Sequence, residues 1–312
     1  MTTMKAVRMH AYGGPEVLKY EDAPRPEPAT GEVLVKVHAA GVNPVGWKIR
    51  DGYMKNFLHY SLPFILGWDL SGVVEAVGPG VTDWKAGDEV YSRPDLGRNG
   101  AYAEYIAARA SELGRKPKSL DHVNSSAIPL AALTAWQAMF DAGGLTAGQR
   151  ILIHAAAGGV GTFAVQLAKW KGAYVIGTAS ERNHAILREL GADEVIDYNR
   201  TPFETVVRDV DVVLDAMGGE TRQRSWQVLK KGGILVSIVG PPSAEDAAAH
   251  GVRQAGIFVQ PNRAQLEEIA RLVDSSKLRP IVEEVLPLKH AALAHEKNQT
   301  LHTRGKLVLR VV

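Results

Sequence analysis

The pattern of apolar and polar positions divides the chain into parts with different periodicity. Up to about residue 122, short apolar stretches are separated by Gly and Pro without helical spacers, which predicts a β-rich domain of barrel or sandwich type. Expected strands in this part cover residues 5–9, 32–39, 73–77 and 100–107.

From about residue 125 the periodicity alternates between strands and helices, which predicts a parallel sheet with helices on both faces. The expected strands cover residues 151–155, 174–178, 194–196, 212–216, 234–239 and 257–259, and helices are expected at residues 181–190 and 221–229. Residues 262–275 have the spacing of an amphipathic helix.

The last part of the chain returns to β structure. Strands are expected at residues 280–286 and 306–311, separated by a helix near residues 289–302. We therefore expect a doubly wound parallel sheet of Rossmann type at residues 123–260, inserted into a discontinuous β-rich domain formed by residues 1–122 and 261–312.

A glycine-rich turn lies at the start of the expected parallel sheet. The apolar run Ile151 to Ile153 is followed by Ala157, Gly158, Gly159, Val160 and Gly161 and then by a helix-forming segment. Glycine permits the tight turn, the approach of backbone to phosphate, and close packing of helix on strand. The N–H groups and positive dipole end of the helix would then hold an anion. A strand, turn, helix and second strand in one unit predict a dinucleotide-binding site.

The nicotinamide cofactor is selected at the end of the second strand, where a carboxylate would bind the ribose 2′-OH of NAD. Here the strand is followed by Ser180, which leaves room for a 2′-phosphate, and Arg182 can pair with that phosphate. These residues favour NADPH. The neighbouring Glu181 leaves NADH open, if its carboxylate rather than the Ser180 hydroxyl faces the ribose.

Composition limits the classes of partner and chemistry. The 312 residues are 46% hydrophobic and 22% charged, with net charge +2 and no basic block, so neither nucleic acid nor a membrane surface is expected as partner. There is no cysteine, and no two histidines have the i, i+4 spacing of a helical metal site, so no metal is expected. The absence of a long apolar run or a signal-like start predicts a cytoplasmic protein.

Ordered sequence blocks along the chain match one family. They are AAGVNP (39–44), LGWDLSGVV (66–74), GDEV (87–90), LTAWQ (133–137), AAAGGVGTFAVQLAK (155–169), GADEVIDY (191–198) and GKLV (305–308). In these blocks the chain resembles the zinc-independent branch of the medium-chain dehydrogenase/reductase superfamily, the quinone oxidoreductase-like NADPH-dependent reductases. The resemblance implies a GroES-like catalytic domain enclosing the Rossmann domain, with the active site in the cleft between them.

The resemblance also implies roles for single residues. Asn43 and Thr134 would touch the nicotinamide side of the cofactor, and Val239, Gly240, Phe258 and Val259 would border the nicotinamide. Ser180, Arg182, Tyr198 and Arg304 would lie near the adenosine phosphate. Zinc-bearing relatives carry Cys where this chain has Val42-Asn43, and Gly-His-Glu where it has Gly67-Trp68-Asp69. The family often has Asp at the position of Gly46.

Without a thiol or a metal, the expected chemistry is that of the cofactor: hydride passes to a conjugated acceptor such as a quinone, enone or enal. Tyr53 is the proposed proton donor, with simple packing or solvent exposure as the alternative. The same fold also supports a non-catalytic NADPH-binding redox sensor or a crystallin-like structural protein. Related reductases pair through the last strand of the Rossmann sheet, here near residues 257–260, which predicts a homodimer.

Overall fold

Two units interleave along the sequence of the computed structural model, which describes residues 2–312. The first unit contains the residues up to Leu130 together with Gln260–Ser276 and Pro280–Val312, and the second contains Ala131–Val259 and Lys277–Arg279. Residues 123–130, which the sequence pattern grouped with the Rossmann domain, belong to the first unit, because the short helix there packs on strands of that unit.

The second unit is built on a parallel sheet with strand order β11-β10-β9-β12-β13-β14. Its strands are β9 (Arg150–Ile153), β10 (Tyr174–Ala179), β11 (Glu194–Asp197), β12 (Val210–Asp215), β13 (Leu229–Ser237) and β14 (Arg253–Gly256). Numbered along the chain, this order is 3-2-1-4-5-6, that of a Rossmann sheet. Ile151, Leu152 and Ile153 of β9 are fully buried, as expected for a central strand covered on both faces.

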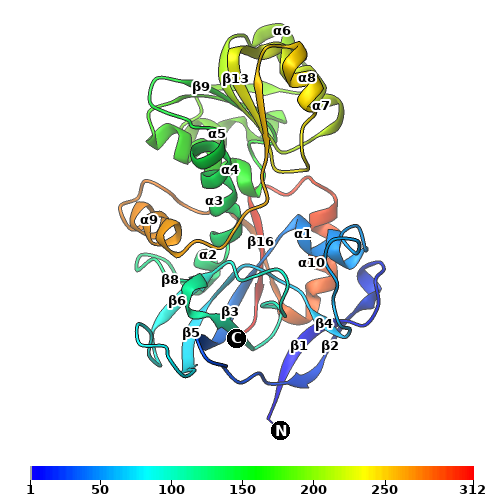
Figure 1. Ribbon diagram of the computed structural model, residues 1–312, viewed down its shortest axis with the longest axis vertical. Helices are drawn as coiled ribbons and strands as arrows, with labels where there is room; N and C mark the ends of the chain where they lie inside the picture. Colours follow the sequence, from blue (N-terminus) through cyan, green and yellow to red (C-terminus); the bar gives the residue numbers. More distant parts are fainter. Residues whose placement is uncertain (1) are drawn as a thin grey trace. The chain divides into compact units, whose positions relative to one another are not determined.

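Helices cover both faces of this sheet, as right-handed crossover connections require. In Figure 1, α4 and α5 lie on one face, and α7 and α8 lie on the other. The helical elements are α3 (Pro129–Trp136), the π-helical turn η3 (Gln137–Ala142), α4 (Gly159–Trp170), η4 (Glu181–Asn183), α5 (His184–Glu189), α6 (Phe203–Val206), α7 (Gly219–Ser225), η5 (Trp226–Val228) and α8 (Ala244–Ala249).

The first unit is β-rich and contains a sheet of order β15-β16-β3-β5-β6-β8, with β7 also paired to β3, and a smaller sheet of order β2-β1-β4. Its strands are β1 (Thr3–Met9), β2 (Leu18–Pro24), β3 (Glu32–Val42), β4 (Phe64–Ile65), β5 (Leu70–Val77), β6 (Glu89–Ser92), β7 (Tyr105–Arg109), β8 (Leu113–Arg115), β15 (Val282–Pro287) and β16 (Lys306–Arg310). Leu307 of β16 pairs antiparallel with Val42 of β3, so the end of the chain completes the first unit. The expected architecture, a Rossmann sheet inserted into a discontinuous β-rich unit, is confirmed.

Helices of the first unit are mostly short. They are η1 (Pro15–Val17), α1 (Pro44–Arg50), η2 (Ala110–Glu112), α2 (His122–Ser126), α9 (Arg263–Asp274), η6 (Leu288–His290) and α10 (Ala291–Gln299). The amphipathic helix expected at residues 262–275 is α9, whose first turn is capped by the Asn262 side chain accepting from the N–H of Gln265. No helix within residues 2–312 is long and apolar enough to cross a membrane.

For two strands the expected position was wrong. The last strand of the Rossmann sheet is β14 at Arg253–Gly256, and residues 257–259 lie beyond it without strand structure. The apolar triplet was misleading because β14 is an edge strand, and its residues are partly exposed rather than buried. The strand expected at residues 100–107 is β7 at Tyr105–Arg109, because residues 100–102 form backbone hydrogen bonds with residues 65–67 instead.

Candidate cofactor and active site

The glycine turn is the best-defined feature of the second unit. It joins the end of β9 to α4, with Gly158 as the residue before the helix and no side chain capping its first turn. A Cβ on Gly161 would lie 2.6 Å from the carbonyl oxygen of Ala156 and still closer to that of Ala155, so no other residue fits there. An uncapped N-terminus of a twelve-residue helix, approached by bare backbone, fits the pyrophosphate of a dinucleotide.

Ser180 and Tyr198 occupy matching positions directly after the carboxyl ends of two neighbouring strands; the row of carboxyl ends is called the sheet edge below. Ala179 of β10 pairs in register with Asp197 of β11, and Ser180 and Tyr198 directly follow these two residues. The Ser180 hydroxyl accepts a hydrogen bond from Asn183 Nδ2 at 3.1 Å. Both residues therefore lie at the carboxyl ends of parallel strands, where open α/β sheets bind ligands; their contact with the adenosine half of a cofactor stays a prediction.

Arg200 is a residue of this edge that the sequence pattern did not point to. Its guanidinium lies 2.7 Å from a carboxylate oxygen of Glu181 and 3.6 Å from one of Asp197. Glu181, the residue that left NADH open, is thus ion-paired with an arginine 19 positions later. No local spacing rule links these residues, because the pair depends on β10 and β11 being neighbours in the sheet.

The other half of the sheet edge carries the residues expected at the nicotinamide. Asp215, Ser237 and Gly256 are register partners at the ends of β12, β13 and β14. Val239 and Gly240 follow β13, while Phe258 and Val259 follow β14. Their common edge is consistent with one binding site, and the Phe258 side chain is 54% exposed there.

Thr134 lies in α3 of the second unit and is buried. The remaining predicted site residues, Asn43, Tyr53 and Arg304, belong to the first unit. The backbone N–H of Arg304 donates to Glu283 Oε2 at 2.9 Å. The structure therefore places the predicted residues in the Rossmann unit, along the sheet edge and, for Thr134, in α3, and in the β-rich unit.

Asn43 is held in a buried polar cluster of the first unit. Its Nδ2 donates to Asp69 Oδ2 at 2.7 Å, and its Oδ1 accepts from the Lys306 ammonium. The same ammonium donates to Asp69 Oδ2 at 2.9 Å and to the Val42 carbonyl at 3.0 Å. Asp69 Oδ1 accepts from the N–H of Leu130 at 2.6 Å. Asn43 therefore has a fixed orientation, and its second Nδ2 hydrogen remains available for donation.

Tyr53 lies in the turn that follows α1. Its ring makes an edge contact with that of Trp47, with centroids 6.2 Å apart, and the side chain is 71% exposed. The hydroxyl is thus accessible to a substrate. Its role as proton donor stays a prediction.

Gly46 on α1 faces a buried chain of polar groups. A Cβ at this position would lie 3.4 Å from the ring of His295. His295 Nδ1 is 3.3 Å from Arg50 Nη1, and its Nε2 is 3.2 Å from the Tyr102 hydroxyl. Since arginine is only a donor, Nδ1 accepts and Nε2 donates. Because position 46 is glycine, no side chain fills the space beside the neutral imidazole ring of His295.

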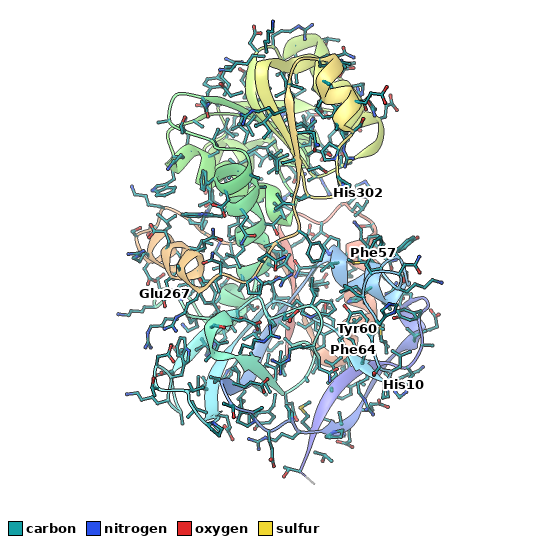
Figure 2. All side chains as sticks on the ribbon, in the orientation of Figure 1. His10, Phe57, Tyr60, Phe64, Glu267 and His302 are labelled. Atoms are coloured by element: carbon teal, nitrogen blue, oxygen red, sulfur yellow. The ribbon has the colours of Figure 1, made fainter. Side chains whose placement is uncertain are left out.

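A pocket of about 420 Å³ opens in the first unit, separate from all the predicted site residues. Tyr60 and Phe64 line it, with ring centroids 4.1 Å apart (Figure 2). The Tyr60 hydroxyl donates to the Leu96 carbonyl, and Arg98 is paired with Glu32. These polar groups are satisfied within the protein, so they do not identify a ligand.

Together, the Rossmann sheet with its glycine turn and the β-rich unit define a class of two-domain nicotinamide-dependent oxidoreductases. Comparison with known proteins agrees. Residues 29–118 match the family model "Alcohol dehydrogenase GroES-like domain", and residues 190–309 match "Zinc-binding dehydrogenase". The chain belongs to the medium-chain dehydrogenase/reductase superfamily, in its quinone oxidoreductase-like branch.

Individual relatives cover the whole chain. The NAD(P)H oxidoreductase RTN4IP1 of Danio rerio, a mitochondrial protein, is 34% identical over 100% of this chain and 92% of its own. The solved quinone oxidoreductase of Coxiella burnetii is 38% identical with a TM-score of 0.92, covering 100% of both chains. A mycobacterial structure complexed with NADPH is 30% identical with a TM-score of 0.89, covering 99% of this chain and 100% of the other. The chain is therefore an NAD(P)H-dependent oxidoreductase.

Zinc, named in one of the matching family models, does not fit the groups at the corresponding positions. By the resemblance, the chain has Val42-Asn43 where zinc-bearing relatives have Cys, and Trp68 where they have His. The Lys306 ammonium already contacts the oxygens of Asn43 and Asp69. Zinc sites use thiolate, imidazole and carboxylate ligands, whereas here an amide and an indole stand beside a carboxylate that is already paired with an ammonium. Within residues 2–312, no group of three or more His, Cys, Asp or Glu side chains is arranged to hold a metal ion.

Proposed function

We propose that this protein is an NADPH-dependent reductase that transfers hydride to a conjugated carbonyl compound, a quinone or the double bond of an enone or enal, without a metal. The observation that carries the proposal is the glycine turn at the head of the Rossmann sheet, where Gly161 lets α4 pack directly on the carbonyls of Ala155 and Ala156 and the N-terminus of α4 has no side-chain cap. The quinone oxidoreductase of Coxiella burnetii and the NADPH complex among the similar structures support the same reaction class and cofactor.

NADPH rather than NADH is proposed on the basis of the groups after β10 and β11. Ser180 presents a hydroxyl in place of the carboxylate typical of NAD enzymes, and Arg182 supplies positive charge two residues later. The ion pair with Arg200 offsets the negative charge of Glu181, a nearby carboxylate that would repel a 2′-phosphate. Fluorescence titration with both cofactors tests this, and a ten-fold tighter binding of NADH would contradict it.

In the proposed mechanism the residues of the protein bind and orient, and bound NADPH supplies the hydride. The first turn of α4 and the edge residues Ser180 and Arg182 would hold the dinucleotide. Hydride addition to a conjugated acceptor leaves negative charge on its oxygen, which a hydrogen-bond donor stabilises. Asn43 has such a donor, because Lys306 occupies its Oδ1 and leaves one Nδ2 hydrogen.

The proton that completes the reduction would come from Tyr53, whose hydroxyl is exposed. Tyr53→Phe removes only this hydroxyl, and loss of a general acid typically lowers turnover about 100-fold. Turnover within about two-fold of the unmodified protein would show that water or another group donates the proton instead.

The reaction is tested by following NADPH consumption at its near-ultraviolet absorbance with a panel of quinones, enones and enals. Turnover with a conjugated acceptor and none with a saturated ketone is the expected result. Tight NADPH binding without turnover on any acceptor would instead support the non-catalytic alternative, a redox sensor or structural protein.

A homodimer is proposed through β14, the edge strand of the Rossmann sheet. Its outer edge can pair with that of a second copy and extend the two sheets into one. Light scattering should give a mass near 67 kDa, twice the 33.7 kDa of one chain, whereas a single-chain mass would contradict pairing.

A cytoplasmic location is likewise a proposal. The Danio rerio relative is named as mitochondrial, and fractionation of cells distinguishes the two locations.

A further inference from the structure

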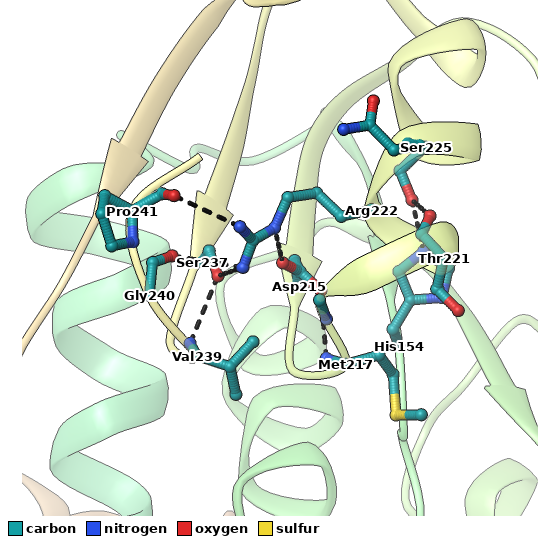
Figure 3. A network of polar contacts seen from close by, with 12 residues as sticks. His154, Asp215, Met217, Thr221, Arg222, Ser225, Ser237, Val239, Gly240 and Pro241 are labelled. Carbon is teal, nitrogen blue, oxygen red and sulfur yellow. Dashed lines mark hydrogen bonds and ion pairs between the residues drawn. The ribbon is translucent and has the colours of Figure 1, made fainter. Parts of the chain in front are cut away.

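Arg222 connects the ends of two strands and a loop at the nicotinamide half of the Rossmann sheet edge (Figure 3). It lies on α7, and its Nε donates to Asp215 Oδ2 at 2.6 Å. Its Nη2 donates to Ser237 Oγ at 2.8 Å and to the Gly240 carbonyl at 3.2 Å, and its Nη1 donates to the Pro241 carbonyl at 3.2 Å. One guanidinium thus joins the end of β12, the end of β13 and the loop after β13.

The carboxylate of Asp215 fixes the position of Arg222. The residue is fully buried, and its Oδ1 accepts from the N–H groups of Met217 at 3.0 Å and Gly218 at 2.7 Å. Burial acts to raise the pKa of Asp215, but the Gly218 N–H and the Arg222 guanidinium outweigh it and hold this pKa below its usual range. Asp215 therefore stays ionised, and its charge keeps the Arg222 guanidinium in place.

The loop that Arg222 holds turns at Gly240 and packs at Pro241 against Gly256 of β14. Gly240 has a φ of 110°, a region open to glycine, and a Cβ there would meet nothing within 4 Å. The N–H of Val239 donates to the same Ser237 Oγ that accepts from Arg222. The two carbonyls bound by Arg222 and this N–H together define the backbone from residue 239 to residue 241.

We propose that Arg222 is a positioning residue of the reductase, which holds the loop of Val239 and Gly240 in the conformation that receives the nicotinamide half of the cofactor. The inference rests on the proposed function, since it concerns the same cofactor site. Arg222 acts through the loop backbone and through Ser237, and its guanidinium is committed to protein groups rather than to the cofactor.

Arginine is required because the accepting groups are spread over three segments. The planar guanidinium presents its five N–H donors in a fixed fork, and here they reach a carboxylate, a hydroxyl and two carbonyls. Lysine would keep the positive charge beside Asp215, but its three N–H donors are all on one nitrogen, so it cannot bind all four groups. Arg222→Lys therefore separates the charge of the side chain from its bridging geometry.

The test compares Arg222→Lys with Arg224→Lys. Arg224 is on the same helix, but it contacts Glu204 at 3.1 Å and Glu220 at 3.9 Å, so it controls for a lost arginine on α7. Binding of NADPH and of 2′,5′-ADP, which lacks the nicotinamide half, is measured for each protein. For Arg222→Lys we expect about ten-fold weaker NADPH binding with 2′,5′-ADP binding unchanged, and for Arg224→Lys no change in either.

The proposal is overturned if Arg222→Lys weakens the binding of NADPH and of 2′,5′-ADP equally, or if its affinity for NADPH is unchanged. If this variant does not fold, as judged by circular dichroism, Ser237→Ala is used, because it removes the hydroxyl shared by Arg222 and Val239 without touching a charge; the same selective loss is expected. Failure of the unmodified protein to bind NADPH is a different result, since it removes the proposed function and the positioning role with it.

Discussion

Lys306 and Asp69 form a buried ion pair, with Nζ and Oδ2 2.9 Å apart, and both side chains are almost inaccessible to solvent. They are 237 positions apart in the chain, and they meet because β16 pairs with β3, which lies beside β5. Burial lowers the pKa of Lys306, against the opposing effect of Asp69. The three ammonium hydrogens find three acceptors, the Val42 carbonyl, Asn43 Oδ1 and Asp69 Oδ2, so the charge is fully compensated.

Lys306→Met should destabilise the first unit strongly. Removing one partner of a buried ion pair leaves an unpaired buried charge and typically costs about 3–5 kcal/mol. The double variant Lys306→Met with Asp69→Asn removes both charges and should recover much of that loss, since the amide introduced at position 69 keeps an oxygen for the Leu130 N–H. Urea unfolding of the three proteins measures this. Equal stability of the single and double variants would contradict an energetic coupling between the two charges.

Gly161→Ala should abolish NADPH binding, whereas Gly158→Ala should retain much of it. The added methyl of the first variant would overlap the carbonyl groups of Ala155 and Ala156, which form the turn itself. The methyl of the second would lie 3.2 Å from the Ala155 carbonyl, a close contact that a small shift relieves. Cofactor titration with circular dichroism as a folding control distinguishes them. A Gly161→Ala protein with unchanged affinity would show that the pyrophosphate is not bound at this turn.

Local sequence patterns identified the elements whose formation depends only on residues close to one another in the chain. The apolar run of β9 and the small residues after it require only neighbouring positions, and so does α9 with its Asn262 cap. The strand β14 was misplaced because apolarity marks buried strands, and this strand lies at an edge. The ion pairs Lys306–Asp69 and Arg200–Glu181 depend on which strands are neighbours in a sheet, so no spacing along a single sequence indicates them.

Stability should fall as the pH drops below about 6.5, in part because of His295. Burial, and secondarily the charge of Arg50, lower the pKa of His295 to about 3, whereas in the unfolded chain it is about 6.5. The folded state thus favours the neutral ring. The contribution is fully present above pH 6.5 and is lost progressively as the pH falls towards 3.

Between pH 6.5 and pH 5 the loss of stability due to His295 should amount to about 1.6 kcal/mol, because one pH unit corresponds to about 1.36 kcal/mol and the unfolded ring is already half protonated at pH 6.5. His295→Gln keeps an acceptor for Arg50 and a donor for Tyr102 but does not titrate, so its unfolding free energy should change less over this interval. Urea unfolding at both pH values measures the difference. An identical pH dependence of the two proteins would mean that His295 is not the group responsible.

Arg182→Ala should weaken NADPH binding about ten-fold and leave NADH binding unchanged, because only the former carries the 2′-phosphate that a guanidinium pairs with. Arg188→Ala on α5 is the matched control: it removes the same charge from an exposed position of the helix that follows η4. Equal weakening by both variants would indicate general electrostatic attraction rather than recognition by Arg182.

Arg200→Ala tests the second element of the same selectivity. Removing Arg200 leaves the Glu181 carboxylate without the ion pair that now offsets it at 2.7 Å, so repulsion of the 2′-phosphate should reduce the ratio of NADPH to NADH affinity. In the Arg200→Ala background, Glu181→Gln should restore that ratio, since the repelling charge is then gone. If Arg200→Ala alone leaves the ratio unchanged, Glu181 does not face the ribose, and Ser180 and Arg182 account for the selectivity by themselves.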